Sequence, residues 1–287
     1  MEFLKKTYFF FIILFLKVLY KMSILLGSEY KYNKKFCKPL KYKRTIPLSK
    51  ILNQIKKELE KLGISVLRPK KKKMPFCTSL WTRDSFININ NKLIMLPLQS
   101  LATRHPDEWK TIPAASKRRK IFPDSPENLE GGDVIQDGNR VLVGLGMRTN
   151  NDGVSRLRKM FPKKRIIVIN HCALHLDCCL MVLPGKRLIY STRYISNLPK
   201  ILKSTYECTT VESIIGKDID PLLATNGLLI DNNIITTDQI KFKKFRNFLR
   251  SLGFNVIEIK YGTLWREEGG IRCLTQWLDK PREQKIC

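Results

Sequence analysis

The amino-acid sequence predicts an α/β fold made of five repeated hairpin-helix-strand units arranged around a pseudo-fivefold axis. One observation is a set of polar marker residues that recur at steps of 46, 45, 51 and 47 residues, a range typical of repeated supersecondary units: Asp84, Glu130, His175, Asn226 and Cys273. The other is that hairpin, helix and strand patterns follow one another in the same order between the markers. Five such units around one axis would bring their starting residues to a common centre.

The first four units each begin with a polar or glycine-marked motif and continue as a β-hairpin. Their segments are WTRDSFININNKLIMLPL from Trp81, EGGDVIQDGNRVLVGLG from Glu130, HLDCCLMVLPGKRLIYS from His175 and NGLLIDNNIITTD from Asn226. The expected turns, flanked by β-branched or aliphatic residues, are Asn90-Asn91, Asp137-Gly138, Pro184-Gly185 and Asn232-Asn233. The fifth segment, GGIRCLTQWL from Gly269, starts with the same kind of motif.

Helix and strand signals fill the spaces between these segments. The stretch PLSKILNQIKKELEKLG predicts a helix, because one face carries Ile51, Ile55, Leu59 and Leu62 and the pattern ends at Gly63. The strand ISVLRP follows it. The same order recurs in DGVSRLRKMF before RIIVIN and in IKFKKFRNFLRSLG before FNVIEI.

The chain of 287 residues carries 53 Lys and Arg against 25 Asp and Glu, a net charge of +28. Such a surplus is typical of proteins that bind nucleic acid or anionic membranes. The lysines are spread along the whole length, however, and the two dense runs, PKKKKMP and SKRRK, are typical of solvated loops. Nucleic acid therefore stays a partner that no motif supports.

The cysteines and the N-terminal segment bear on the cellular compartment. Eight cysteines without a C-x-x-C pair, in a chain of this length, favour reduced thiols and a cytoplasmic protein. The N-terminal apolar run is too short to span a membrane, but it resembles a signal peptide without a clear cleavage site. Another interpretation of this segment is that translation begins at Met22. We expect residues 1–26 to lie outside the fold and residues 27–287 to form one domain, with secretion or anchoring through residues 1–26 as the alternative.

The predicted centre would gather three carboxylates, one imidazole and one thiol: Asp84, Glu130, Asp177, His175 and Cys273. His175 and Asp177 are two residues apart, so on a strand they would point from the same face. The glycine pairs at 131–132 and 269–270 would let the backbone approach closely. Carboxylates suit a planar guanidinium, whose carbon a thiolate can attack while an imidazole protonates the departing amine.

Five motifs also carry a family resemblance. WTRD, LEGGD, GLGMRTN, LHLD and GGIRCLT resemble the motif set of the guanidino-group-modifying enzymes of the pentein superfamily. This group includes dimethylarginine dimethylaminohydrolases, arginine deiminases and amidinotransferases, and the resemblance extends from about Gly27 to Trp277. It implies a five-bladed α/β propeller, a covalent thiouronium-type intermediate on cysteine, a small guanidino substrate, and no metal or organic cofactor.

The resemblance also implies roles for individual residues. Cys273 resembles the nucleophile and His175 the general acid/base, and Glu130 resembles the carboxylate that pairs with the histidine or the substrate. Asp84 and Asp177 resemble the acids that bind the guanidinium.

Two further residues are expected in the substrate site. Arg148 resembles an arginine that holds a substrate carboxylate. Asp133 is grouped with the substrate-binding acids, with a supporting salt bridge to Arg83 as the alternative.

The motifs leave three functions open. Citrulline-forming hydrolysis of arginine or an N-methylated arginine is the first, because GGDV followed by GLGMRTN resembles the dimethylarginine hydrolase-like branch. Arg272 replaces the histidine of the agmatine deiminase pattern. Transfer of the amidino group to an amine is the second function, and a non-catalytic pentein-fold protein that binds nucleic acid or an acidic partner is the third. Oligomeric state is not indicated.

The segment HCALHLDCC leaves a zinc site as a competing hypothesis. His171 and His175 are four residues apart with thiols nearby, but a metalloprotease helix needs glutamate where Cys172 stands, and the segment is typical of a strand. Without the family resemblance, Cys273 would be interpreted as a buried structural thiol.

Overall fold

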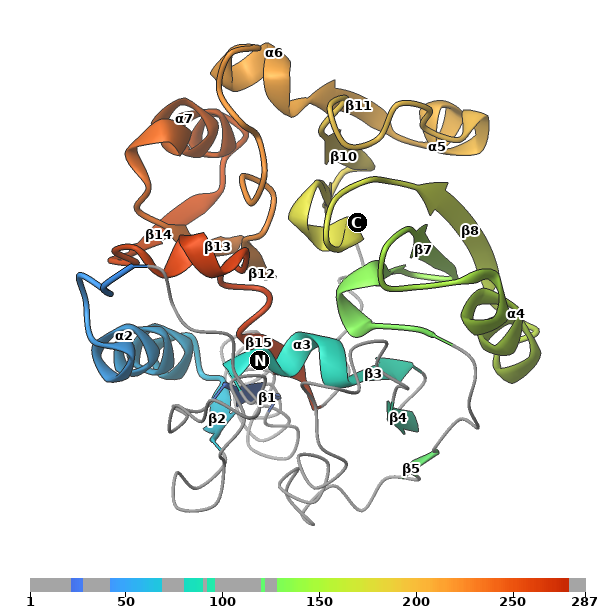
Figure 1. Ribbon diagram of the computed structural model, residues 1–287, viewed down its shortest axis with the longest axis horizontal. Helices are drawn as coiled ribbons and strands as arrows, with labels where there is room; N and C mark the ends of the chain where they lie inside the picture. Colours follow the sequence, from blue (N-terminus) through green and yellow to red (C-terminus); the bar gives the residue numbers. More distant parts are fainter. Residues whose placement is uncertain are drawn as a thin grey trace, which may run out of the picture.

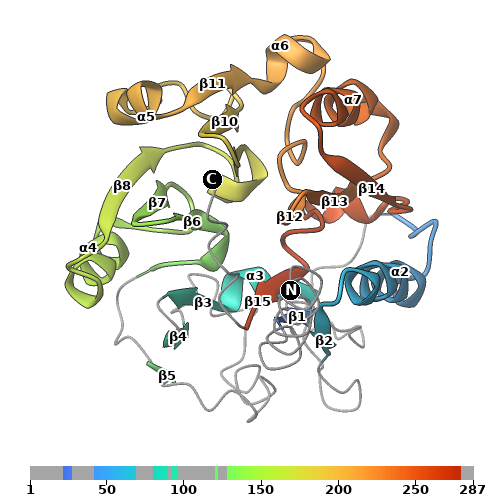
Figure 2. The same ribbon diagram turned by 180° about the vertical axis from the view of Figure 1, so that it is seen from behind.

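The computed structural model describes residues 22–27, 42–68, 80–89, 92–95, 120–121 and 128–278. These residues form five separate three-stranded sheets. Figure 1 shows the sheets arranged around a common centre, with the longer helices on the outside, and Figure 2 shows the same arrangement from behind. The predicted α/β content is confirmed, and a hairpin followed by a parallel strand recurs in the sheets.

Each sheet pairs an antiparallel hairpin with a third strand that runs parallel to the second strand of the hairpin. A parallel neighbour needs a crossover connection, which a helix usually supplies. Four of the sheets follow the chain order and consist of β3 (Phe86–Ile89), β4 (Lys92–Met95) and β5 (Lys120–Ile121); β6 (Val134–Asp137), β7 (Arg140–Leu145) and β8 (Arg165–Asn170); β9 (Leu180–Leu183), β10 (Arg187–Tyr190) and β11 (Glu207–Thr210); and β12 (Leu228–Ile230), β13 (Asn233–Thr237) and β14 (Asn255–Ile259).

The fifth sheet joins the two ends of the described chain. Strand β15 (Thr275–Trp277) runs antiparallel to β1 (Ser23–Leu26), and β2 (Ser65–Leu67) runs parallel to β1. The fifth hairpin is therefore assembled from segments far apart in the sequence. The predicted boundary after residue 26 is wrong, because residues 23–26 form a strand inside a sheet; residues 1–21 lie outside the described residues.

The outer helices follow the sequence periodicity. The predicted helices are confirmed as α2 (Leu48–Lys61), α4 (Asn151–Met160) and α7 (Lys243–Ser251). Gly63 adopts φ +76° just after α2, a left-handed conformation that glycine reaches without strain. The first residues of the predicted third helix form a 3-10 turn, η6 (Ile240–Phe242), and the shorter helices α5 (Lys200–Thr205) and α6 (Val211–Ile215) and the 3-10 turn η7 (Leu264–Glu267) were not predicted.

Apolar side chains fill the space between each sheet and its helix. On α2, Ile51, Ile55 and Leu59 are at most 1% exposed and pack in one cluster with Ile24 of β1 and Tyr261. Burial of each such aliphatic side chain contributes about 1.5–3 kcal/mol. Across the described residues, every helix is too short or too polar to traverse a lipid bilayer.

Two hairpin turns are displaced by one residue from their predicted positions. The second hairpin turns at Gly138 and Asn139, and the fourth at Asp231 and Asn232. Gly138 and Asp231 adopt φ +54° and +50°, which explains why the first turn position falls on these residues. The predicted turn at residues 90–91 lies outside the described residues.

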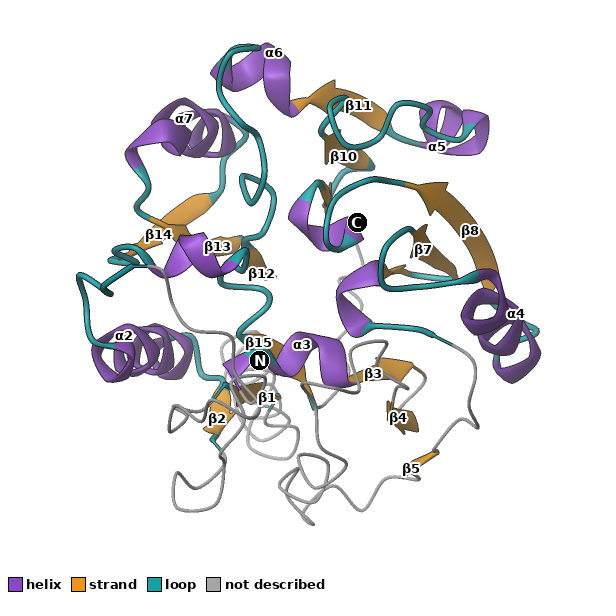
Figure 3. Cartoon of the chain, viewed as in Figure 1, coloured by secondary structure: helices purple, strands orange, loops and turns teal. Residues whose placement is uncertain are grey.

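A short helical turn precedes three of the hairpins. These turns are α3 (Thr82–Ser85), η4 (Gly131–Asp133) and η5 (Leu176–Cys178), and Figure 3 shows α3 near the centre of the molecule. His175 lies just before η5 and Asp177 inside it. The expectation that both point from one face of a strand is wrong, because a 3-10 turn has about three residues per turn rather than a two-residue alternation.

Candidate active site

Glycines allow the hairpin starts to meet at close range. A Cβ atom on Gly132 would lie 2.6 Å from Cγ of His175, and one on Gly270 would lie 2.5 Å from Oδ1 of Asn226. Neither position has room for a side chain, so the expected close approach at both glycine pairs is confirmed.

His175 lies between two carboxylates. Its Nε2 donates a hydrogen bond to Oε2 of Glu130 at 2.7 Å, and its Nδ1 lies 3.7 Å from Oδ1 of Asp84. All three side chains are buried. Burial by itself would lower the pKa of His175, but the charge of Asp84 and the hydrogen bond to Glu130 raise it to about 10, with help from the charge of Asp133. His175 is therefore an imidazolium at neutral pH.

Arg148 borders this cluster from the more exposed side. Its Nη1 lies 3.7 Å from Oε1 of Glu130, and its side chain is 26% exposed, whereas Glu130 is fully buried. Arg148 is thus next to the expected catalytic carboxylate and still reaches solvent.

Cys273 lies in the turn before β15 and is only 3% exposed. Its Sγ donates to Oδ1 of Asn226 at 3.4 Å, and its backbone N–H donates to the same oxygen at 3.3 Å. The N–H of Arg272 donates to that oxygen as well, at 3.1 Å. One amide oxygen therefore fixes both the backbone and the sulfur of the predicted nucleophile.

Asp177 is held by partners within the protein. Its Oδ2 accepts a hydrogen bond from Nε of Arg83 at 3.1 Å and lies 3.4 Å from Nε of Arg272. Its Oδ1 accepts from Nδ2 of Asn226 at 3.1 Å. Burial and the charge of Arg83 lower the pKa of Arg272 to about 10, although Asp177 opposes this shift. The ion pair of Arg83 is thus with Asp177 and not, as the alternative had it, with Asp133.

Asp133 fastens η4 to the start of η5. It accepts hydrogen bonds from Oγ1 of Thr149 at 2.7 Å and from the backbone N–H of Leu176 at 2.8 Å, and it lies 3.0 Å from Nε2 of His171. The carboxylate is fully buried. We therefore assign Asp133 a positioning role rather than the expected contact with substrate.

The predicted site residues form two groups, and the turn η5 contributes one residue to each. His175, just before η5, lies with Glu130 and Asp84. Asp177, inside η5, lies with Asn226 beside Cys273. Asn226 was recognised in the sequence only as the marker of its repeat. Its place as the fourth marker could have indicated a role in the site, since the marker residues of adjacent repeats lie close together.

Two sets of side chains could supply metal ligands among the described residues. They are Asp84, Glu130 and His175, and Asp177, Cys178 and Cys273, with the donor atoms of each set within 4.8 Å of one another. Neither set contains His171, which pairs with Asp133. His171 pairs with Asp133 and His175 with Glu130, so the structure does not support one zinc site that uses both histidines.

The family comparison covers more than half of the chain. The family model for arginine deiminase matches residues 49–212, a range that includes Asp84, Glu130, His175 and Asp177 but ends before Asn226 and Cys273.

Two curated relatives match about half of the chain. An uncharacterized protein of Bacillus subtilis, YkgA, is 28% identical over 151 residues, which is 52% of this chain and 51% of the relative. An arginine deiminase of Staphylococcus epidermidis is 28% identical over 196 residues, which is 53% of this chain and 48% of the relative. The matched segments span about half the length of these relatives.

Solved structures share the fold over nearly the whole chain. The N-terminal domain of ArgZ, an arginine dihydrolase from cyanobacteria, has a TM-score of 0.74 at 16% identity over 91% of this chain and 99% of that one. SxtG, an amidinotransferase from Microseira wollei, has a TM-score of 0.72 at 18% identity over 90% and 94%. The dimethylarginine dimethylaminohydrolase of Pseudomonas aeruginosa has a TM-score of 0.70 at 17% identity over 90% and 100%.

Proposed function

This chain belongs to the arginine deiminase family of the pentein superfamily, and on that premise we propose that it is a cysteine-dependent hydrolase. Its substrate is arginine or an N-methylated arginine, and its amino-acid product is citrulline. No reaction partner other than water is needed for this reaction.

The observation that carries the proposal is the buried imidazolium of His175 between the carboxylates of Glu130 and Asp84. Asp177, two residues further along, shares a hydrogen-bond partner, Asn226, with Cys273. His175 is protonated at neutral pH, as a general acid must be before the leaving group departs. Three carboxylates, Asp84, Glu130 and Asp133, act on it with negative charge, and Arg148 adds a guanidinium 3.7 Å from Glu130. These carboxylates suit a cationic substrate.

In the first half of the reaction, the thiolate of Cys273 attacks the guanidinium carbon. A carbon–sulfur bond forms, the carbon–nitrogen bond to the departing amine breaks, and His175 gives that nitrogen its proton. In the resting protein the thiol donates to Asn226, and it gives its proton to solvent water before attack. The adjacent substrate cation stabilises the thiolate that forms.

In the second half, water attacks the thiouronium carbon. Neutral His175 takes a proton from the water, the carbon–oxygen bond forms, and the carbon–sulfur bond breaks to restore Cys273. The protonated citrulline gives a proton to the Cys273 thiolate, and ammonia or a methylamine leaves with the proton received from His175, so the enzyme returns to its initial protonation state.

The substrate contacts follow from the charges around each acid. We assign the guanidinium first to Asp84, which lies 3.7 Å from His175, and to Glu130 beside it, between His175 and Arg148. Asp177 is shared by Arg83 and Arg272, so it contacts the substrate only when Arg272 withdraws. Arg148, partly exposed beside Glu130, is placed to hold the substrate carboxylate.

Two broader proposals accompany this one. The five sheets form the blades of a five-bladed α/β propeller, an arrangement supported by their shared hairpin-plus-parallel-strand pattern. The protein works in the cytoplasm, where thiols stay reduced, and its five described cysteines are free.

The test is mass spectrometry of the purified protein after incubation with arginine, methylated arginines, agmatine, or arginine plus glycine. We expect citrulline from arginine or a methylated arginine. Cys273→Ala should lower turnover by about 10⁴-fold or more, since the covalent step is lost. The matched control is Cys172→Ala, an exposed thiol, which should keep normal turnover.

Other products would assign the other functions. Guanidinoacetate from arginine plus glycine would make the protein an amidinotransferase. Absence of any product, together with salt-dependent binding to a polyanion, would favour the non-catalytic protein that the charge of +28 suggests. Citrulline formation that persists in Cys273→Ala would contradict the mechanism.

A further inference from the structure

We propose that Cys178 and Cys273 form a reversible disulfide when the protein reacts with a hydroperoxide, which makes this pair of thiols an oxidative modification site. The reactivity of Cys273 rests on the proposed function. The position of the two sulfur atoms does not. Cys178 has no part in the proposed hydrolysis, so its place beside the nucleophile needs a separate explanation.

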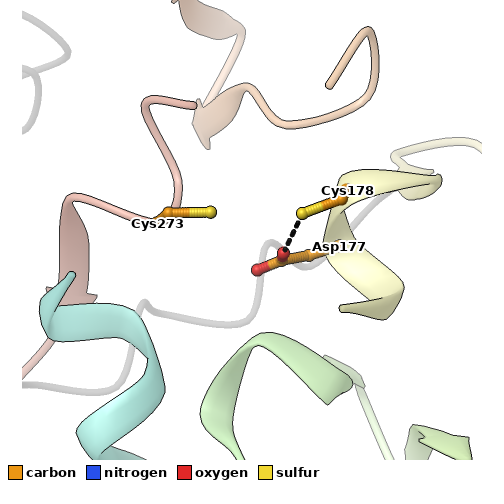
Figure 4. A group of neighbouring side chains, drawn as sticks. All are labelled: Asp177, Cys178 and Cys273. Carbon is orange, nitrogen blue, oxygen red and sulfur yellow. Dashed lines mark hydrogen bonds between the residues drawn. The ribbon is translucent and has the colours of Figure 1, made fainter. Parts of the chain in front are cut away.

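The two thiols face each other from different elements. Cys178 lies in η5 and Cys273 in the turn before β15. Figure 4 shows their side chains pointing toward one another, with Asp177 beside Cys178. The two Sγ atoms and a carboxylate oxygen of Asp177 lie within 4.8 Å of one another. A modest side-chain rotation or loop shift would bring the sulfur atoms to a bond length of about 2.05 Å.

Cys178 is kept as a protonated thiol in the resting protein. It is fully buried, its Sγ donates to Oδ1 of Asp177 at 3.7 Å, and Nδ2 of Asn226 donates to it at 3.8 Å. The adjacent sulfur of Cys273, burial and the surrounding negative charge raise the pKa of Cys178 well above its usual value. Cys178 is thus unreactive by itself and is placed to react only with a group on Cys273.

The chemistry needs one equivalent of hydroperoxide as oxidant. The thiolate of Cys273 attacks a peroxide oxygen, the oxygen–oxygen bond breaks, and the sulfur is oxidised to a sulfenic acid as water or an alcohol leaves. The sulfur of Cys178 then attacks the sulfur of Cys273, and its proton passes through Asp177 to the departing hydroxide, which leaves as water. The sum is two thiols and one hydroperoxide giving one disulfide, one water and a second water or an alcohol, with two electrons moved from sulfur to oxygen.

A metal ion is the competing occupant of this cluster. Two thiols and a carboxylate are suitable zinc ligands. Asp177, however, already binds the guanidinium groups of Arg83 and Arg272, and these two charges repel a divalent cation at short range. A disulfide is neutral and leaves these ion pairs intact, so the contacts favour it.

The experiment treats the full-length protein with hydrogen peroxide, blocks the remaining thiols and maps tryptic peptides by mass spectrometry. We expect the peptide that begins at Cys273 to be joined to the peptide that begins at Ile166, with the loss of two hydrogen atoms and reversal by dithiothreitol. The second peptide also holds Cys172 and Cys179. Variants must therefore identify the partner as Cys178.

Two variants make that identification. Cys178→Ser should abolish the linked peptide. Cys179→Ser should retain it, because Cys179 is also buried but its Sγ donates to the backbone oxygens of Leu176 and His175 instead. Turnover lost to peroxide should return with dithiothreitol in the wild-type protein, but not in Cys178→Ser, where Cys273 is over-oxidised to sulfinic acid.

Three results would overturn the proposal. They are a linked peptide that persists in Cys178→Ser, over-oxidation of Cys273 in the wild-type protein without any linked peptide, and an inactivation reversed by a chelator rather than by a thiol. The mass measurement does not depend on turnover. A disulfide in a protein without guanidine turnover would therefore refute the proposed function alone, and turnover without a disulfide would refute this proposal alone.

Discussion

The two halves of the candidate site solve the problem of buried charge in opposite ways. We define the imidazole half as Asp84, Glu130 and His175, and the thiol half as Asp177, Asn226 and Cys273. In the imidazole half, two carboxylates surround one buried cation. In the thiol half, one carboxylate lies between two guanidinium groups, from Arg83 and Arg272, and an amide completes its hydrogen bonds.

The difference indicates a division of labour. In the imidazole half the carboxylates, together with Asp133, keep His175 protonated and favour a guanidinium, although Arg148 lies 3.7 Å from Glu130. In the thiol half the one carboxylate already pairs with two guanidinium groups, so its contacts hold the nucleophile in place instead of binding a further cation. Each half can then be tested by a change that disturbs one and spares the other.

The largest effect is expected from Asp177→Asn in the thiol half. The substitution leaves the guanidinium of Arg83, 8% exposed, in the interior without its counter-charge. Breaking a buried pair in this way costs about 3–5 kcal/mol of the free energy of unfolding. Denaturant unfolding measures the loss. The control is Glu60→Gln, which breaks the exposed Lys56–Glu60 pair and should cost about 0–1 kcal/mol.

Equal losses in these two variants would contradict the view that Asp177 is a buried anchor of the thiol half. A large loss of turnover with no loss of stability would place Asp177 in direct contact with substrate instead, as the family resemblance implies.

The contrast between the halves also marks how far the sequence could predict the site. Residue type and repeat spacing were enough to select Glu130, His175 and Cys273 as candidates, and the structure pairs Glu130 with His175. They could not show whether Arg83 pairs with Asp133 or with Asp177. That choice depends on the orientation of a 3-10 turn, and HLD gives no sign of such a turn.

The fold shows the same limit. The periodicity of α2 and the turn signals of the hairpins are local, so the sequence predicted them. Strand β1 was missed because its four residues, Ser23–Leu26, adjoin a longer apolar run and carry no alternation, and because its partner β15 is at the other end of the chain. Strand pairing over such a separation is set by tertiary packing rather than by local sequence.

The imidazole half predicts a pH dependence of stability. Between the usual pKa of 6.5 and the folded value of about 10, His175 holds a proton in the native protein that the unfolded chain lacks. The stabilisation is therefore complete below about pH 6.5 and is lost as the pH rises toward 10. The slope approaches about 1.4 kcal/mol per pH unit in that window.

Unfolding by denaturant at several values between pH 7 and pH 9 measures this slope. The matched variant is His175→Gln, which keeps a polar side chain but cannot bind the proton, so its stability should change less steeply over the same range. Parallel curves for the two proteins would show that His175 is not charged in the native state.

The smallest effect is expected from Asn226→Ala. This variant tests most directly whether the thiol half aligns the nucleophile without binding the substrate. The variant removes the oxygen that orients the backbone and sulfur of Cys273, while Asp84 and Glu130 are untouched. We expect kcat to fall about tenfold, equivalent to about 1.4 kcal/mol, with KM nearly unchanged. Asn232→Ala, in an exposed hairpin turn, is the control and should leave both constants unchanged.

Asn226→Ser should recover part of the kcat lost in Asn226→Ala, because the serine hydroxyl can still accept one hydrogen bond from the Cys273 loop. A merely structural role for Asn226 would lower the fraction of folded protein and leave the kinetics of the folded part unchanged. A rise in KM as large as the fall in kcat would mean that the thiol half also binds the substrate cation. Aligning the nucleophile and attracting the substrate would then be shared by the two halves rather than divided between them.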